Sequence, residues 1–548
     1  MKYVAFTIGP IIATLGKARK TRELWAASYT FSYLMKEITR GLKKRRGLKF
    51  ILPYVDDPEL FDTPESEKWG AGLFPDIFII RVKDELESLP LVRKQVDKVI
   101  RKFASETKEH LNWKQQAEIE SYLHRYLQLY SLECELRAEQ NPILEITPML
   151  KQLEFQARFI EVEPSISPLF TLINRSTNSF LAKDAFPKTG TKSWKSFPTL
   201  IEIATRELKD ETATGENTYD ELISDLKYKV DGDLESEKDP ESKSLLALKQ
   251  AFPDSFKTYH KYICVVHADG DGIGRLLQRL WKKDRSDAYN LKQLKSFSKK
   301  LFEFVKWAVP HIYRSGGEVI YAGGDDLLFF APVSFRGTSI FHLLDELDQE
   351  FKIIMSSAGF YPVPSLSFGL SISYYKFPMF EALEQSRNFL FQKAKKYHPS
   401  KNAVAFEVRM HSGQTFSANY QLGSESYQSV LSMLESLELD STLNSVIAKV
   451  QSAGRALATF ADNRMAIRHF LDESFNEAIH RDQEPFMEAV KSFLPEAFAD
   501  AVTVWDYQHQ KGNIPHDQFN EKRQAFAIRQ AYAGLRILSF LFHQEQDV

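Results

Sequence analysis

The sequence predicts an α+β fold with two ferredoxin-like domains, a helical insert domain and an all-α C-terminal domain. Two separate regions each combine apolar strand segments with helix-length segments in the strand–helix–strand–strand–helix order of a ferredoxin-like domain. The residues after 415 instead keep a helical periodicity to the end of the chain. We call the two ferredoxin-like domains the first and the second palm, and we expect them to pack as a pseudo-dimer.

The length and the composition of the chain suggest where the domains begin and end. A chain of 548 residues is long enough for about three or four domains. We expect the first palm with a helical extension at 1–138 and a mixed helical insert with an acidic linker at 139–243, followed by the second palm at 244–412 and the helical domain at 413–548. Asp231-Gly232-Asp233 has no strand before it, so we interpret it as part of the linker at 231–243.

In the first palm, apolar alternation predicts strands at 3–8, 48–53 and 76–82, and helical spacing predicts a helix at 11–41. Residues 84–138 also have a helical pattern. The first half of the 11–41 helix carries four basic residues, which are Lys17, Arg19, Lys20 and Arg22. A solvated helix face explains such a cluster, but its position after a strand and Gly9-Pro10 also suits a contact with RNA or a partner.

The second palm begins with an apolar strand at 262–266 that runs into two aspartates, Asp269 and Asp271. A helix at about 286–309 follows, and then a β-hairpin whose turn is Gly323-Gly324-Asp325-Asp326. Further helices are expected at 199–209, 218–228, 338–358 and 379–396, and further strands at 365–373 and 404–408. The C-terminal helices are expected at 424–437, 440–461, 464–478, 483–506 and 517–544.

The two carboxylate motifs of the second palm predict a metal site. If the hairpin lies beside the first strand, Asp269, Asp325 and Asp326 converge at one edge of the sheet, with Asp271 as the alternative if the register differs by two residues. Carboxylates this close repel one another unless cations neutralise them, and oxygen ligands favour Mg²⁺ or Mn²⁺. Two such ions roughly 3.5–4 Å apart would suit a phosphoryl transfer in which Asp325 and Asp326 are catalytic.

Glycines and lysines near these carboxylates are candidates for binding a nucleotide. Gly323 and Gly324 lack side chains and let a large ligand approach the backbone, and Gly270 lies beside Asp269. Lys395 and Lys401 flank the end of the last helix of the second palm, where they are candidates for neutralising a triphosphate. Ordinary solvated lysines remain the alternative.

Several classes of function lack support in the sequence. The net charge of −2 gives no global basic excess, so nucleic-acid binding would rely on local patches or partners. Cys134 and Cys264 are too few and too far apart for a zinc site, and they fit a reducing, cytoplasmic setting. No apolar run approaches the ~18–20 residues of a membrane span. The dipeptide His516-Asp517 lacks the further ligands of a metal phosphohydrolase.

The segment from His267 to Gly274, together with the Gly-Gly-Asp-Asp turn, resembles the catalytic palm of the CRISPR type III effector large subunit. The stretch from Thr7 to Ser28 and the Phe197-Pro198 segment resemble the III-B branch. The resemblance implies a subunit of an RNA-guided complex with a guide RNA, a target RNA and other III-B subunits. It implies that target binding switches on the conversion of ATP, with release of pyrophosphate, into a messenger, commonly cyclic oligoadenylate. Similarity to diguanylate-cyclase palms supports Lys395 and Lys401 as phosphate ligands.

Three departures from the family pattern modify these expectations. The chain starts directly in the first palm rather than in an HD nuclease domain, so DNA cleavage by this subunit is not expected. The cysteine zinc ribbon found in many members is absent or metal-free, so no zinc is expected. Asp76 stands where the III-B pattern usually has Asn. It is a candidate for binding the amino group of S-adenosylmethionine, because some members without the HD domain are implied to join that molecule to ATP. An exposed Asp that caps a turn is the alternative.

Two other functions stay open. A free-standing nucleotide or diguanylate cyclase would have the same carboxylates, but the first palm and the helical tail argue against it. A catalytically silent, nucleotide-binding scaffold subunit would not need the intact carboxylate set, because a buried carboxylate cluster without a role is costly.

Overall fold

The fold is described from a computed structural model of the chain. The structure describes residues 1–62, 70–83, 86–110, 116–155, 197–209, 219–223, 240–436, 442–460, 463–474, 484–509 and 516–542. The expected linker at 231–239 and most of the expected 218–228 helix lie outside these residues. The described chain forms two compact units. Unit 1 contains Met1–Thr199, Gly272–Phe329 and Gln349–Ser365, and unit 2 contains Leu200–Asp271, Phe330–Asp348 and Leu366–Val548.

The strand order confirms the α+β fold class with two ferredoxin-like sheets. The four-stranded sheet has the order β2-β3-β1-β4, and the six-stranded sheet has the order β12-β11-β10-β5-β7-β6. Within β6-β7-β5-β10, the strands follow the same second, third, first, fourth chain order as the smaller sheet. The strands are β1 Lys2–Gly9, β2 Leu48–Leu52, β3 Ile77–Val82, β4 Gln128–Glu135, β5 Tyr262–Asp271, β6 Glu318–Gly323, β7 Asp326–Ala331, β10 Ser365–Tyr374, β11 Ala403–Arg409 and β12 Thr415–Gln421. Short strands β8 Ser334–Phe335 and β9 Thr338–Ser339 pair with each other.

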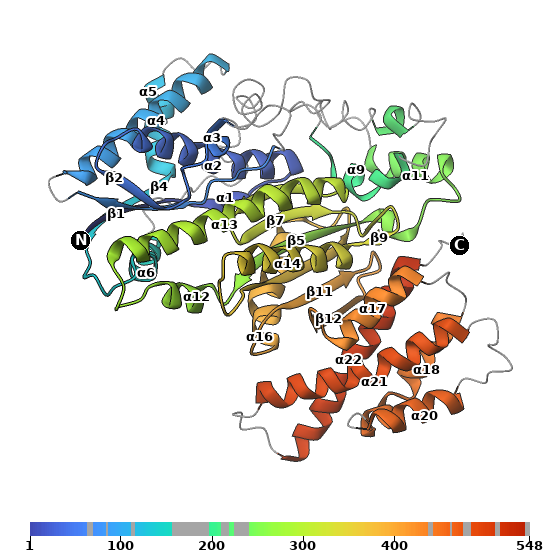
Figure 1. The fold of residues 1–548 in the computed structure, drawn as a ribbon. Coiled ribbons are helices and arrows are strands. Elements are labelled where there is room, and N and C mark those ends of the chain that lie inside the picture. Colours follow the sequence, from blue (N-terminus) through green and yellow to red (C-terminus); the bar gives the residue numbers. More distant parts are fainter. Residues whose placement is uncertain are drawn as a thin grey trace. The chain divides into compact units, whose positions relative to one another are not determined.

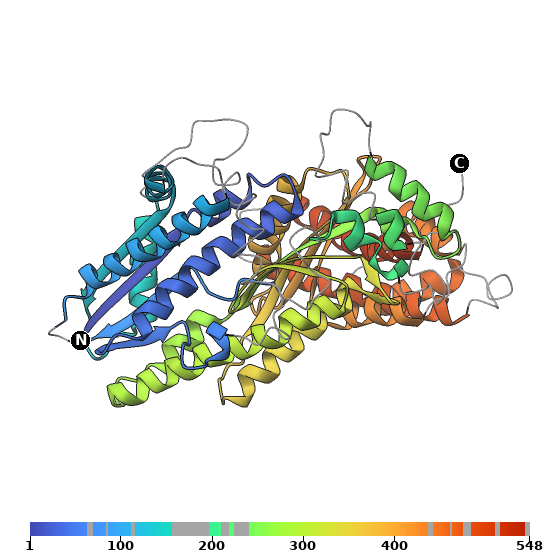
Figure 2. The same cartoon turned by 90° about the horizontal axis from the view of Figure 1, so that it is seen from above.

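In unit 1, helices cover the sheet of the first palm. Strand β1 pairs antiparallel with both β3 and β4. Helix α2 (Thr21–Lys43) lies beside α4 (Ser88–His110), as Figure 2 shows. The unit also holds α5 (Gln116–Tyr126), α6 (Pro142–Glu154), α12 (Ile273–Leu280) and α13 (Asp287–Arg314). Helix α2 packs on β6 and α13 packs on β2, so within this unit the first palm contacts the first strand of the carboxylate hairpin and the helix before it.

Two expectations for the first palm were wrong. The single helix expected at 11–41 is two helices, α1 (Ile11–Leu15) and α2, because the backbone of Lys20 is extended. The Glu23 carboxylate accepts hydrogen bonds from the backbone N–H groups of Arg19 (2.8 Å) and Lys20 (3.3 Å), which starts α2 at Thr21. Residues 128–135, expected to be helical, form strand β4, which supplies the fourth strand of the ferredoxin-like order.

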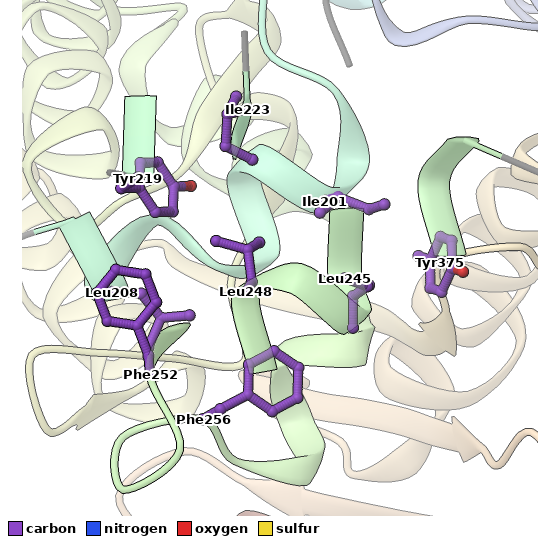
Figure 3. Close-up of a cluster of buried hydrophobic side chains, with 9 residues drawn as sticks. All are labelled: Ile201, Leu208, Tyr219, Ile223, Leu245, Leu248, Phe252, Phe256 and Tyr375. Atoms are coloured by element: carbon purple, nitrogen blue, oxygen red, sulfur yellow. The ribbon is translucent and has the colours of Figure 1, made fainter. Parts of the chain in front are cut away.

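In unit 2, the insert and the palm share a hydrophobic core. Helices α9 (Leu200–Ala204) and α11 (Pro240–Ala251) bury apolar side chains against Tyr375, the residue after β10 (Figure 3). The cluster comprises Ile201, Leu208, Tyr219, Ile223, Leu245, Leu248, Phe252, Phe256 and Tyr375. Helix α11 begins at Pro240, so the last residues of the expected linker are helical instead.

The C-terminal region is helical, as expected, except at its start. Residues 415–421 form β12, which pairs antiparallel with β11. The helices are α17 Glu425–Ser436, α18 Thr442–Ser452, α19 Gly454–Thr459, α20 Arg464–Ser474, α21 Glu484–His509 and α22 His516–Phe542. Helices α17, α21 and α22 lie beside one another (Figure 1), and α22 also packs on β12. The expected boundaries of the four domains remain predictions.

The helix expected at 379–396 contains a π-helical segment. Helix α15 (Met379–Asn388) passes into a π-helix at Phe389–Ala394, and α16 (Lys395–Tyr397) follows. This segment lies very close to β10, because a Cβ atom added to Gly369 would be 2.1 Å from the Ser386 carbonyl oxygen and 2.2 Å from the Leu390 nitrogen. Only glycine fits at that position, and the close packing fixes the segment that carries Lys395.

Candidate nucleotidyltransferase site

The two aspartates of β5 have different surroundings. Strand β5 extends to Asp271, so Asp269 and Asp271 are two residues apart and point to the same face of the sheet. Asp271 is 2% exposed and accepts hydrogen bonds from the Ser367 hydroxyl (2.5 Å) and the Asn402 backbone N–H (2.9 Å). The side chain of Asp269 is 23% exposed. This difference favours Asp269 over Asp271 as the metal ligand, since Asp271 is already committed to holding the fold.

Lys395 lies directly on this acidic strand. Its ammonium group forms an ion pair with Asp269, donates to the Gly270 carbonyl oxygen at 2.8 Å, and is 3.2 Å from an Asp271 oxygen. Burial lowers the pKa of Lys395, but the charges of the two carboxylates outweigh that effect, so its pKa is raised above the ordinary value. The lysine is therefore a cation held at the carboxylates expected to bind metal.

The loop after Lys395 is held in an unusual backbone conformation. Lys401 has φ of 60° and Asn402 has φ of 48°, a region that costs non-glycine residues about 1 kcal/mol or more. The bond from the Asn402 backbone to Asp271 holds this conformation. The half-buried Lys401 side chain makes no hydrogen bond or ion pair within the described residues. Its role as a triphosphate ligand stays a prediction.

The Gly-Gly-Asp-Asp segment forms the expected two-residue hairpin turn. Strand β6 ends at Gly323 and β7 begins at Asp326, so Gly324 and Asp325 form the turn. Gly324 has φ of 91°, which suits the first central position of a type II′ turn. Asp325 is half-buried and Asp326 is exposed.

Tyr321 is a site residue that the sequence analysis missed. A Cβ atom added to Gly323 would be 1.8 Å from the Tyr321 hydroxyl, so the tyrosine occupies the space that we expected Gly323 to leave for a nucleotide. Burial is the main reason why the pKa of Tyr321 is raised well above its ordinary value. The charges of Asp76, Asp326 and Asp325 raise it further, in that order. The first palm and the hairpin thus meet around this ring.

Asp76 is half-buried, so the explanation as an exposed turn cap was wrong. Burial, followed by the charge of Glu154, raises the pKa of Asp76 to about 6. Glu154 itself accepts a hydrogen bond of 2.7 Å from the Thr7 hydroxyl on β1. The Asp76 carboxyl therefore lies in a crowded acidic environment, within electrostatic reach of the Tyr321 hydroxyl.

The structure gathers the predicted residues into two groups. Asp269, Gly270 and Lys395 lie together in unit 2. In unit 1, Asp76 joins the turn residues Gly323, Gly324, Asp325 and Asp326 around Tyr321. The convergence of the two groups remains a prediction.

The basic residues of the first palm lie around the break between α1 and α2. Lys17 and Arg19 are exposed, and the Lys17 ammonium lies 5.8 Å from the centre of the Tyr126 ring. Lys20 and Arg22 are only partly exposed. An exposed basic loop can contact a phosphate backbone, just as the predicted basic helix face could. The contact with RNA or a partner stays a prediction.

Comparison with known proteins finds relatives for two segments of the chain. A model of the Cas10/Cmr2 second palm domain matches residues 262–405, and a model of the N-terminal domain of the CRISPR-associated protein Cmr2 matches residues 3–116. The CRISPR system Cmr subunit Cmr2 of Pyrococcus furiosus is 28% identical, over 28% of this chain and 19% of its own length. Two segments of the chain are similar to domains of Cas10/Cmr2 proteins. The resemblance to the type III-B large subunit is thus confirmed.

Two solved structures share the fold of this chain. A chain of the type III-B Cmr-beta complex in its apo state has a TM-score of 0.54 at 12% identity, over 98% of this chain and 81% of its own. A chain of Cmr-beta bound to cognate target RNA has a TM-score of 0.52 at 11% identity, over 98% and 82%. Within the described residues, the longest helices are too polar to cross a membrane.

The donor types of this site fit a hard divalent cation. No group of three or more His, Cys, Asp or Glu side chains within the described residues is arranged to hold a metal ion. Mg²⁺ commonly binds through one or two carboxylates together with substrate phosphates and water, so it needs no all-protein cluster. Asp269 and the Gly270 carbonyl already hold a cation, the Lys395 ammonium, which shows that these oxygens accept positive charge.

Proposed function

We propose that this chain makes a nucleotide second messenger, cyclic oligoadenylate, from ATP by metal-dependent nucleotidyl transfer. The carboxylates of Asp269, Asp325 and Asp326 carry this proposal, because each belongs to a strand end or turn of the matched second palm. The reaction joins the 3′-hydroxyl of one ATP to the α-phosphorus of another, and the bond from that phosphorus to pyrophosphate breaks. Mg²⁺ or Mn²⁺, when bound, would lower the pKa of the hydroxyl and stabilise the leaving pyrophosphate.

Each protein group has a role that follows from its charge and position. Asp269, Asp325 and Asp326 supply the oxygen ligands for the two cations. Lys395 neutralises Asp269 until nucleotide is bound and then pairs with a phosphate oxygen of ATP, since its ammonium group needs an anionic partner in either state. Lys401 extends this positive charge. Gly270 and Gly324 leave their main-chain atoms accessible to the nucleotide.

We propose further that the chain acts in the cytoplasm within a type III-B effector complex, with other Cmr subunits, a guide RNA and a target RNA. The matches of two segments to Cas10/Cmr2 and Cmr2 domain models support this assembly. The match to Cmr-beta bound to cognate target RNA supports the fold on which it depends. The exposed Lys17 and Arg19 are candidates for the contact with RNA or with a neighbouring subunit.

The test is product analysis on the reconstituted complex. The complex is supplied with guide RNA, matching target RNA, Mg²⁺ or Mn²⁺ and labelled ATP, and products are identified by mass. We expect cyclic adenylates that need target RNA and the metal, and that disappear in Asp325→Ala/Asp326→Ala. If the double variant matches the wild type and neither makes product, the chain is a silent scaffold. A scaffold should also show little Mg²⁺-dependent thermal stabilisation by ATP.

The surroundings of Asp76 favour a second candidate reaction, in which ATP is joined to S-adenosylmethionine. Here a hydroxyl of S-adenosylmethionine attacks the α-phosphorus of ATP, which gives an AMP conjugate and pyrophosphate. The half-buried Asp76 carboxyl near Tyr321 would bind the amino group of the co-substrate, and a cation beside it would stabilise its charged form. The same product assay, run with and without S-adenosylmethionine, decides between the two reactions. The idea fails if Asp76→Asn changes neither the product nor the affinity for S-adenosylmethionine.

A further inference from the structure

A cavity in unit 2 is lined by none of the proposed catalytic groups. It has a volume of about 690 Å³, within the usual size range of small-ligand sites. Its walls come from the π-helix and α16 of the second palm, from β12, and from α21 and α22. The Gln508 side chain donates to the carbonyl oxygens of Lys396 (3.2 Å) and Tyr397 (3.0 Å), and Gln530 accepts from the Asn419 backbone at 2.8 Å. These bonds fix the walls in place.

The charge of this cavity is positive. Lys393 and Lys396 both line it, and none of its described lining residues is acidic. The Lys396 ammonium donates to the side-chain amide oxygen of Gln392 at 2.5 Å, whereas Lys393 is exposed and makes no hydrogen bond or ion pair within the described residues. The nearby Asp506 is neutralised by Arg523 through two hydrogen bonds of 2.8 Å. The cavity therefore favours an anion.

The remaining lining groups suit an aromatic ring with polar edges. Tyr507 is 45% exposed although it lines a cavity, which leaves part of its ring open for stacking, and Phe526 adds a second aromatic surface. The Asn419 side-chain amide makes no hydrogen bond within the described residues and offers both a donor and an acceptor. Lysines beside an open aromatic ring and a free amide are groups that bind a nucleotide through its phosphate and base.

We propose that this cavity binds a nucleotide unit, with its base stacked on Tyr507 and its phosphate between Lys393 and Lys396. The unit could come from a free nucleotide or from a single-stranded RNA, which share this chemistry. Lys395 lies between the two cavity lysines in sequence but contacts Asp269 and Gly270 instead. A ligand in the cavity would therefore contact the opposite face of the segment that carries Lys395. The link from this ligand to catalysis rests on the proposed function.

The binding test uses the full-length chain with EDTA present, so that metal-dependent binding at the proposed catalytic site is suppressed. Labelled ATP and a labelled ten-nucleotide single-stranded RNA are titrated separately, which distinguishes the two sources. Lys393→Glu/Lys396→Glu should lower the affinity for whichever probe binds by at least about tenfold. The matched control Lys376→Glu/Lys449→Glu makes the same charge change at exposed positions of unit 2 and should change affinity less than about twofold. Thermal unfolding checks that both variants are folded.

A stacking variant and a salt titration give independent readouts. Tyr507→Ala should weaken binding at least about fivefold, and Tyr507→Phe should retain it. For RNA, the slope of log affinity against log salt should become shallower by about 0.7 in the double lysine variant, the value for one lost phosphate contact. Equal effects of the cavity and control variants on both probes would overturn the proposal. So would an equal loss in Tyr507→Ala and Tyr507→Phe. These assays need no messenger synthesis, so their failure is distinguishable from failure of the proposed function.

Discussion

The two palms have the same strand order but differ at the positions where the second palm carries its carboxylates. In the first palm, β1 ends at Gly9 and residues 53–76 connect β2 to β3. In the second palm, β5 continues through Asp269 to Asp271, and only Gly324 and Asp325 connect β6 to β7. A tight turn places its aspartates at the sheet edge, and a long connection does not. The ferredoxin-like order thus provides the same scaffold twice, whereas only the second palm places carboxylates at one strand end and one turn, where we propose the chemistry.

The largest difference between the palms should appear when an acidic pair is changed in the connection between the second and third strands of each palm. These connections are β2–β3 in the first palm and β6–β7 in the second. Asp325→Asn/Asp326→Asn should lower messenger synthesis at least about 100-fold, because losing cation stabilisation of the transition state costs about 3 kcal/mol. The first palm offers a matched pair in its own connection, Asp56 and Asp57. Asp56→Asn/Asp57→Asn should leave the rate within about twofold. Equal losses in the two variants would contradict a catalytic second palm. The rates are measured with labelled ATP on the assembled complex.

A second prediction concerns the end of the first strand in each palm. Asp271→Asn should destabilise the protein by about 2–4 kcal/mol, because Asp271 is buried and holds Ser367, Asn402 and Lys395. Thr7→Val removes one hydrogen bond at the corresponding end of β1 and should cost only about 1 kcal/mol. Urea unfolding measures both. A smaller loss in Asp271→Asn than in Thr7→Val would show that the acidic strand end is not structural.

The third prediction is a pH dependence confined to the first palm. The pKa of Asp76 is raised to about 6, so the folded state binds this proton more tightly than the unfolded state. Its contribution to stability is present below pH ~4 and is lost as the pH rises through 6. Asp76→Asn should therefore be more stable than the wild type by about 1–2 kcal/mol at pH 8, and about equal at pH 4. A difference that grows on acidification would refute the assignment. Urea unfolding at the two pH values gives the measurement.

The smallest expected effect concerns the basic loop of the first palm. Lys17→Glu/Arg19→Glu should weaken RNA binding by the assembled complex about threefold to tenfold at ~50 mM salt, and less at ~200 mM, since phosphate contacts are screened. Lys376→Glu/Lys449→Glu on unit 2 serves as the control and should have little effect. Filter binding measures the affinity for RNA. Equal losses of affinity in the two variants would show that the loop has no special role.

The sequence was sufficient to predict the strands and the turn that carry the carboxylates. Each motif directly follows or ends an apolar strand, and a glycine turn between two such strands has few alternatives. The shorter features were missed for local reasons. Strand β4 carries glutamates at 133 and 135 and follows two long helices, so its pattern resembled a continuing helix. The break before α2 depends on Glu23 bonding back to Arg19 and Lys20, which apolar periodicity does not reveal.

Contacts between distant segments were beyond the sequence. Lys395 and Asp269 are more than a hundred residues apart, so only the folded sheet brings the ammonium onto the carboxylate. One contact could have been found. Residues two apart in a strand share a face, so the missing side chain of Gly323 leaves room for the ring of Tyr321.

The π-helix between α15 and α16 also has a consequence for how this chain tolerates insertions and deletions. A π-helical turn contains one residue more than an α-helical turn, so the residues after it keep the direction that an α-helix one residue shorter would give them. Deleting one residue from Phe389–Ala394 would therefore restore an α-helix and leave Lys395 facing Asp269, whereas an α-helix of the present length would turn Lys395 away by about 100°. Relatives that have one residue fewer here should have an unbroken α-helix and keep the lysine–aspartate pair.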